Sequence, residues 1–254
     1  MSNGRLTLFN MQHNSQRLFL FCLLLLIAVI QPARAEKIDI DALIKKTVKA
    51  VRADHFEKAY QMIKPLMNSN NERIQSLIAF FYQYGNKEIT GEDDHNPYYD
   101  LDKSVRYYRK AAKSGNAAVL FSFGMTLRKT AYKYRVLDPN RDKINKEVFD
   151  IFLASAEGGH AWSQIQVADE YINAFVVERN YIQAYKWNLL AGRRFDTTTG
   201  EGSFKGFMDQ TLKVLEKHHL NEIEVLYARA LAELWEKEHP NAIKTYPPPM
   251  LGIY

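Results

Sequence analysis

The stretch EVFDIFLASAEGGHAWSQIQVADEYINAFVVERNYIQAYKWNLLAG, residues 147–192, decides the fold. Its pattern predicts a helix, a corner that contains glycine, a second helix, a short loop and a third helix. Small and apolar residues recur along one face of the second helix, at Ala161, Ser163, Val167, Ala168 and Tyr171. Because this face is narrow, we expect it to pack closely against a neighbouring helix.

The same spacing returns upstream at a fixed offset. A shift of 44 residues places Gly115 on Gly159 and Gly124 on Ala168. A further shift of 45 reaches a weaker copy, whose later positions hold Ile74, Ile78, Ala79 and Tyr82. Self-similarity at a fixed period is the signature of stacked helix pairs, each of which buries its apolar face against the next. We therefore predict an all-α fold, an α-solenoid of stacked antiparallel helix pairs with a capping C-terminal helix.

These copies resemble the Sel1-like repeat, a relative of the tetratricopeptide repeat. The matching positions are Tyr107, Ala111, Ala112, Gly115, Ala117 and Gly124 in one copy, and Ala156, Gly159, Ala161, Ala168 and Tyr171 in the next. The resemblance covers residues 54–235 and is weakest in the first copy, where Asn70 replaces the glycine and Glu72 an alanine. It implies a curved surface that holds protein partners, such as cell-envelope machinery or host proteins.

The rest of the chain divides around the repeats. We predict a signal peptide over 1–35, an N-terminal cap helix over 36–53, the Sel1-like repeat solenoid over 54–200, C-terminal capping helices over 201–239 and an extended Pro-rich tail over 240–254. Asn221 and Glu224 have the spacing of a capping box at the start of the last helix. Pro65 predicts an irregularity near the end of an early helix.

The N-terminal segment has the three parts of a secretory signal peptide. Arg17 precedes an apolar run of 13 residues, 18–30, and Ala33-Arg34-Ala35 supplies a cleavage site of small residues. A helix of that length reaches about 20 Å, whereas the hydrocarbon core of a bilayer is about 30 Å thick, which favours cleavage over an uncleaved anchor. We therefore expect a mature protein that begins at Glu36 and is periplasmic or secreted, with no stable membrane insertion.

Charge and cysteine content argue against a nucleic-acid-binding protein and against a protein stabilised by disulfide bonds. The net charge of +5 falls to +2 without residues 1–35, because that segment holds three arginines and no acidic residue. We identify no basic stripe interleaved with aromatic residues and expect no nucleic-acid partner. The single cysteine, Cys22, lies in the apolar run of the signal peptide. The predicted mature chain therefore relies on packing rather than on disulfide bonds.

Several motifs contain residue types that bind metals or phosphate or act in catalysis, but their spacing is wrong for these roles. The run Glu92-Asp93-Asp94-His95 and the pair His218-His219 place ligands at consecutive positions, which do not converge on one ion. Residues 200–206 lack the spacing of a phosphate-binding loop, no serine lies in a nucleophile elbow, and His160 is expected at the surface or at the N-terminal end of a helix rather than as a base. We expect no catalytic residue, no metal and no cofactor. The alternative is an envelope hydrolase or a binder of peptidoglycan or β-lactam-type ligands.

Aromatic residues divide into core positions and candidate partner-binding positions. The repeat pattern predicts core positions for Tyr107, Phe123, Tyr171, Tyr185 and Trp187. Two insertions between repeats should project from one edge of the stack. These insertions and one outward repeat position hold the partner-binding candidates, Tyr98, Tyr99, Tyr132, Tyr134, Arg135 and Trp162. Exposed Tyr, Trp and Arg anchor protein interfaces, although a loop aromatic can equally fold down over its own repeat. The predicted function is a non-enzymatic, exported interaction scaffold for a protein partner.

Overall fold

The computed structural model describes residues 39–84, 96–135, 138–198 and 202–244. From Ile40 onward these residues belong to one compact unit, which is helical and has no strand in its described part. The helices are α2 (Ile40–Arg52), α3 (Phe56–Ile63), η1 (Lys64–Leu66), α4 (Glu72–Gln83), α6 (Leu101–Ala111), η2 (Ala112–Ser114), α7 (Ala117–Ala131), α8 (Pro139–Glu157), α9 (Ala161–Asn173), α10 (Tyr181–Thr198), α11 (Gly202–His218), α12 (Glu222–Glu238) and α13 (Pro240–Lys244). The predicted all-α fold is confirmed.

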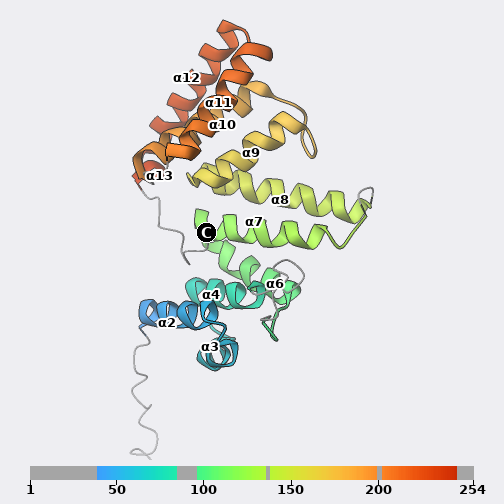
Figure 1. Cartoon of the computed structure of the whole chain (residues 1–254), viewed down its shortest axis with the longest axis vertical. Helices are drawn as coiled ribbons and strands as arrows, with labels where there is room; N and C mark the ends of the chain where they lie inside the picture. Colours follow the sequence, from blue (N-terminus) through green and yellow to red (C-terminus); the bar gives the residue numbers. More distant parts are fainter. Residues whose placement is uncertain (1–38, 85–95, 136–137, 199–201, 245–254) are drawn as a thin grey trace, which may run out of the picture. The chain divides into compact units, whose positions relative to one another are not determined.

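Each helix packs mainly on its neighbours in the sequence, as expected for a solenoid. From α4 to α10 the main contacts join successive helices, and α10 then packs on both α11 and α12. Figure 1 shows this succession of helices from α4 (cyan) to α12 (red). The prediction of an α-solenoid is therefore confirmed.

Two glycines form equivalent corners of successive repeats. Gly115 has φ +71° and Gly159 has φ +85°, a left-handed conformation that glycine adopts without a steric penalty. The residue after each glycine caps the next helix. Asn116 accepts hydrogen bonds from the amides of Ala118 and Val119 at 3.0 and 3.2 Å. The offset of 44 residues therefore marks the same backbone turn twice.

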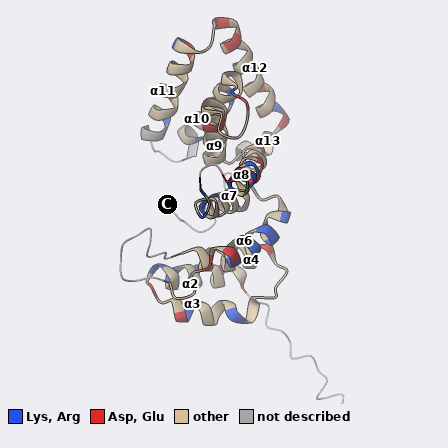
Figure 2. Cartoon of the chain, turned by 90° about the vertical axis from the view of Figure 1, so that its right-hand side faces the viewer, with Lys and Arg blue, Asp and Glu red and all other residues tan. Residues whose placement is uncertain are grey.

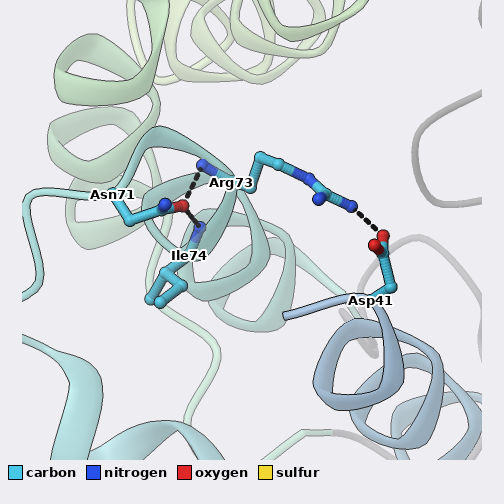
Figure 3. Close-up of polar contacts among 4 residues, drawn as sticks. All are labelled: Asp41, Asn71, Arg73 and Ile74. Carbon is cyan, nitrogen blue, oxygen red and sulfur yellow. Dashed lines mark hydrogen bonds and ion pairs between the residues drawn. The ribbon is translucent and has the colours of Figure 1, made fainter. Parts of the chain in front are cut away.

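Helix α4 is held at its start by a cap and by a contact with α2. Figure 3 shows that the Asn71 side chain accepts hydrogen bonds from the amides of Arg73, at 3.0 Å, and Ile74, at 3.2 Å. The Arg73 guanidinium forms an ion pair with Asp41 of α2. The irregularity predicted at Pro65 is a short 3-10 helix, η1, which follows α3.

The predicted core positions are confirmed by their burial. Phe123, Tyr185 and Trp187 are buried, and Tyr107 and Tyr171 are partly buried against the core. Helix α12 packs on the stack through Trp235. The Trp235 ring lies edge-on to that of Trp187, with centroids 6.0 Å apart, and its indole N–H donates a hydrogen bond to Glu157 at 2.6 Å. The predicted capping box is present at the start of α12.

Several predicted loops and the predicted tail are partly helical. Helix α8 begins at Pro139, and Asp138 caps it, so the last five residues of the second predicted insertion, 131–143, are helix rather than a projecting loop. Proline suits this first helical position because the amide it lacks would have no partner there. The tail predicted to be extended starts with α13, Pro240–Lys244, and for these five residues the prediction is wrong. The predicted signal peptide, residues 85–95 of the first predicted insertion, 85–100, and residues 245–254 lie outside the described residues.

Candidate protein-interaction surfaces

Tyr98 folds inward against the first helix pair. Its ring stacks on Tyr60 with centroids 4.3 Å apart, and its hydroxyl forms a hydrogen bond with Glu57. That hydrogen bond raises the pKa of Tyr98. The turn before it is anchored by buried Asn96, which donates to the Phe81 carbonyl at 2.7 Å. Tyr98 therefore acts as a staple over its own repeat, one of the two alternatives for a loop aromatic.

Tyr99 and Trp162 are also not free surface side chains. Tyr99 is half-buried, and it interacts with other residues. Trp162 was expected to point outward, but it is half-buried and packs edge-on against Phe195 at 5.1 Å. The outward interpretation of Trp162 is wrong, because the first turn of α9 leans on α10.

Three of the candidate residues are exposed at the corner between α7 and α8. Tyr132 is 69% exposed, and the guanidinium of Arg141 lies 5.9 Å from its ring. Tyr134 and Arg135 are exposed beside it. The structure brings these three residues together, and their role in binding stays a prediction.

His160 is buried at the start of α9, so of its two expected positions, the surface and the N-terminal end of a helix, the second is confirmed. The ring stacks on Phe121 at 4.4 Å, and Nδ1 accepts a hydrogen bond from the Ser163 amide at 3.3 Å, so His160 caps α9. Burial, together with the positive charge of Arg194, lowers the pKa of His160 to about 4. Ser163 also bonds to Ser155, at 2.7 Å. This serine and histidine cluster is therefore a neutral, buried helix cap.

Helix α12 has a second apolar face that the sequence analysis did not single out. Its inner face packs into the core through Ala228, Ala232 and Trp235. The outer face carries the terminal apolar stripe, four residues that are each at least half exposed: Ile223, Leu226, Tyr227 and Leu234. Their spacing follows the helical period, and this second stripe could have been recognised in the sequence. Figure 1 shows α12 in red after α11. An exposed apolar stripe of this kind marks an interaction site.

Helices α4 and α6 form a second candidate surface, which we call the basic hollow. It has a volume of about 230 Å³, and it is lined by Met67, Tyr82, Lys103, Arg106, Tyr107 and Lys110. The cations lie at i, i+3 and i+7 of α6, on one face of that helix. Figure 2 shows the blue of Lys and Arg on α6. The sequence pattern predicts no basic stripe with interleaved base-stacking aromatic residues, but on α6 three cations lie beside Tyr107.

The helix stack is similar to a solved structure. The crystal structure of a Sel1 repeat protein from Oxalobacter formigenes superposes with a TM-score of 0.51 at 14% sequence identity, covering 82% of this chain and 77% of that one. This chain has a Sel1-like repeat fold. A protective antigen of uropathogenic Escherichia coli that displays an SLR fold gives a TM-score of 0.42 at 19% identity, covering 74% of this chain and 42% of the other. No protein-family model and no curated protein matches the sequence.

Two other kinds of site, a metal centre and a membrane-spanning helix, concern the described part of the Sel1-like solenoid. Within it, no group of three or more His, Cys, Asp or Glu side chains is placed to hold a metal ion. The acidic run 92–95 lies outside the described residues. Among the described helices none is both long enough and apolar enough to cross a bilayer.

Proposed function

We propose that this chain is a non-enzymatic scaffold that holds a protein partner through the end of its Sel1-like solenoid. The observation that carries the proposal is the terminal apolar stripe on α12, where Ile223 is 78% exposed. Burial of apolar surface stabilises a complex by about 25 cal/mol per Å² before the costs of association. Tyr227 adds an aromatic ring of the type that is enriched at interface hot spots. The exposed corner with Tyr132, Tyr134 and Arg135 is a second part of the proposed surface.

A photocrosslinking experiment tests this proposal. A photoreactive amino acid is placed at Leu226, at Tyr132 or, as a control, at exposed Lys58 of α3. We expect a discrete protein adduct from Leu226 that is absent from Lys58. Leu226→Glu should reduce capture of the same protein at least tenfold. Lys58→Glu, which changes the charge of exposed α3 away from the stripe, should leave capture unchanged. Equal adducts at all positions would contradict the proposal.

The exposed corner requires its own variant. Replacing Tyr132, Tyr134 and Arg135 together by Ala should weaken capture by about 2 kcal/mol or more if the corner contacts the partner. The melting temperature should barely change, because the three side chains are exposed. Unchanged capture by the folded triple variant would remove this corner from the binding surface.

We also propose that the protein is exported and acts in the cell envelope or on a host partner. The support is the signal-peptide pattern of residues 1–35, with its apolar run and small-residue cleavage site. Mass spectrometry of the envelope and culture fractions should find a chain that begins at Glu36. A full-length chain embedded in the membrane would overturn the proposal of export by cleavage.

A further inference from the structure

We infer that the basic hollow on α4 and α6 binds an acidic, extended peptide segment of a partner protein. The inference rests on the proposed scaffold function, but it concerns a surface other than the terminal apolar stripe. Its lining combines three cations with two tyrosine rings and a methionine. These groups suit a chain that presents carboxylates and apolar side chains alternately.

The cations in the basic hollow are available to an external anion. Lys103 forms an ion pair with Asp100 at 3.1 Å. Arg106 and Lys110 form no ion pair with any acidic residue in the part of the chain that the structure describes. Both side chains are exposed. Although burial raises it, the pKa of the Asp100 carboxyl is lowered overall by Lys103 and Arg106, so Asp100 offsets part of the positive charge of the hollow, while Lys110 has no ion pair among the described residues.

The floor of the hollow is rigid and aromatic. The rings of Tyr82 and Tyr107 lie nearly parallel, with an interplanar angle of 12° and centroids 5.9 Å apart. Both hydroxyls donate to Met67, from Tyr107 to its carbonyl at 3.4 Å and from Tyr82 to its sulfur at 3.8 Å. Because these contacts hold the rings in place, less ordering is needed when a ligand binds.

The cations also lie close to this aromatic floor. The Lys103 ammonium is 5.2 Å from the Tyr82 ring centroid, and the Lys110 ammonium is 5.3 Å from that of Tyr107. A ligand side chain that contacts a ring can therefore lie beside carboxylates that contact the ammonium groups. This arrangement couples an apolar contact to charge-assisted hydrogen bonds.

The spacing of the cations matches an extended peptide better than a small anion. Seven residues of helix rise about 10 Å, which separates Lys103 from Lys110 along α6. Alternate side chains of an extended strand point the same way about every 7 Å, so carboxylates two residues apart reach cations on successive turns. A single phosphate cannot span that length. The volume of about 230 Å³ is also smaller than that of most small-molecule pockets, and it suits one inserted side chain.

The surrounding charges favour a peptide over a nucleic acid. Two charged residues of α6 that do not line the hollow are already paired. Arg109, directly before Lys110, forms an ion pair with Glu147 at 2.5 Å, and Asp102 forms one with Lys133 at 3.0 Å. The lining of the hollow holds three cations, fewer than the roughly 6–10 phosphate contacts of a protein that binds DNA tightly. A short acidic segment needs only this stripe.

Fluorescence anisotropy tests the inference with a defined probe. The probe is the fluorescein-labelled peptide Gly-Glu-Leu-Glu-Tyr-Glu-Gly, titrated with the purified protein. We expect saturable binding that weakens as salt is raised. Arg106→Glu with Lys110→Glu should lower the affinity at least tenfold. A matched control, Lys58→Glu with Lys213→Glu, makes the same charge change at exposed lysines elsewhere and should bind as the wild type does.

Further measurements distinguish a peptide site from a phosphate site or a nucleic-acid site. If the double Glu variant does not fold by circular dichroism, Arg106→Gln with Lys110→Gln replaces it. Competition by millimolar inorganic phosphate, or tighter binding of a labelled single-stranded DNA, would overturn the inference. Equal peptide binding by wild type and a folded double variant would also overturn it. Leu226→Glu should leave peptide binding intact, so failure of the terminal apolar stripe and failure of the hollow give different results.

Discussion

At the scale of single residues, the solenoid depends on small side chains where helices cross. Gly124 of α7 faces Phe152 of α8, and a Cβ atom at that position would lie 2.7 Å from the ring. Phe152 cannot easily move aside, because it is fully buried and the Arg128 guanidinium lies 4.6 Å from its ring. The glycine is therefore required by close approach, in contrast to Gly206, where an added Cβ meets nothing within 4 Å.

A substitution at each glycine tests this difference. Gly124→Leu should lower the free energy of unfolding by about 1–3 kcal/mol through overpacking. Gly206→Leu makes the same change on open α11 and should stabilise slightly, because leucine has the higher helix propensity. Chemical denaturation measures both. A loss of less than a few tenths of a kcal/mol at Gly124 would mean that the crossing of α7 and α8 is misplaced.

A second residue-scale prediction concerns the stability of the protein at acidic pH. Burial lowers the pKa of His160 to about 4 in the folded protein, against an ordinary value of about 6.5 in the unfolded chain. Below pH 6.5 the unfolded state therefore binds the extra proton first. The neutral cap contributes its full stability above pH 6.5, and up to about 3 kcal/mol is lost as pH falls towards 4.

The comparison with His160→Asn isolates this contribution. Asparagine also caps a helix, but it does not take up a proton in this range. Urea denaturation of both proteins from pH 7 to pH 4 should show a steeper loss of stability for the wild type. Parallel curves would contradict the assignment of His160 as a buried neutral cap.

At the scale of elements, six of the described helices begin at a side-chain cap that the sequence supplies, whereas α3 begins without one. Asn71, Asp100, Asn116, Asp138, His160 and Asn221 all accept a backbone hydrogen bond at a helix start. Only the last was predicted. The repeat pattern predicts the glycine corners. It does not predict the caps, because capping depends on the local backbone geometry at each helix start.

The cap of α4 provides an element-scale prediction. Asn71→Ala removes the acceptor for the amides of Arg73 and Ile74 and should cost about 1 kcal/mol of unfolding free energy. Asp41→Ala removes only the exposed ion pair with Arg73 and should have a much smaller effect. Thermal denaturation monitored by circular dichroism ranks the two variants. A larger loss for Asp41→Ala would show that the contact between α2 and α4 matters more than the cap.

At the scale of the whole molecule, the solenoid buries several separate clusters. One joins α2, α3 and α4 around Phe80 and Phe81, and a larger one runs from α6 to α12 and includes Trp187 and Trp235. In a stack of this kind, stability is close to a sum of contributions from neighbouring helices. A destabilising substitution at one end of the stack should therefore affect mainly the helices next to it.

Trp235→Ala tests this locality. It removes a buried ring from beside Trp187 and the hydrogen bond to Glu157, and it should cost about 3–5 kcal/mol. In hydrogen exchange followed by mass spectrometry, protection should fall in α10 and α12 and persist in α2 and α4. Uniform loss of protection across the chain would show a single cooperative unit instead.

The sequence alone determined the architecture, because helix pairs that cannot bury their apolar faces separately must repeat at a fixed spacing. That spacing is visible in Gly115 and Gly159, in Ala168 and in the aromatic core positions. The tertiary structure alone decided which polar and aromatic residues remain at the surface. Tyr98 and Trp162 turned inward because Tyr60 and Phe195 lie beside them. The first contact joins a turn to α3 and the second joins α9 to α10, and residue spacing within one segment carries no information about what another segment brings against it.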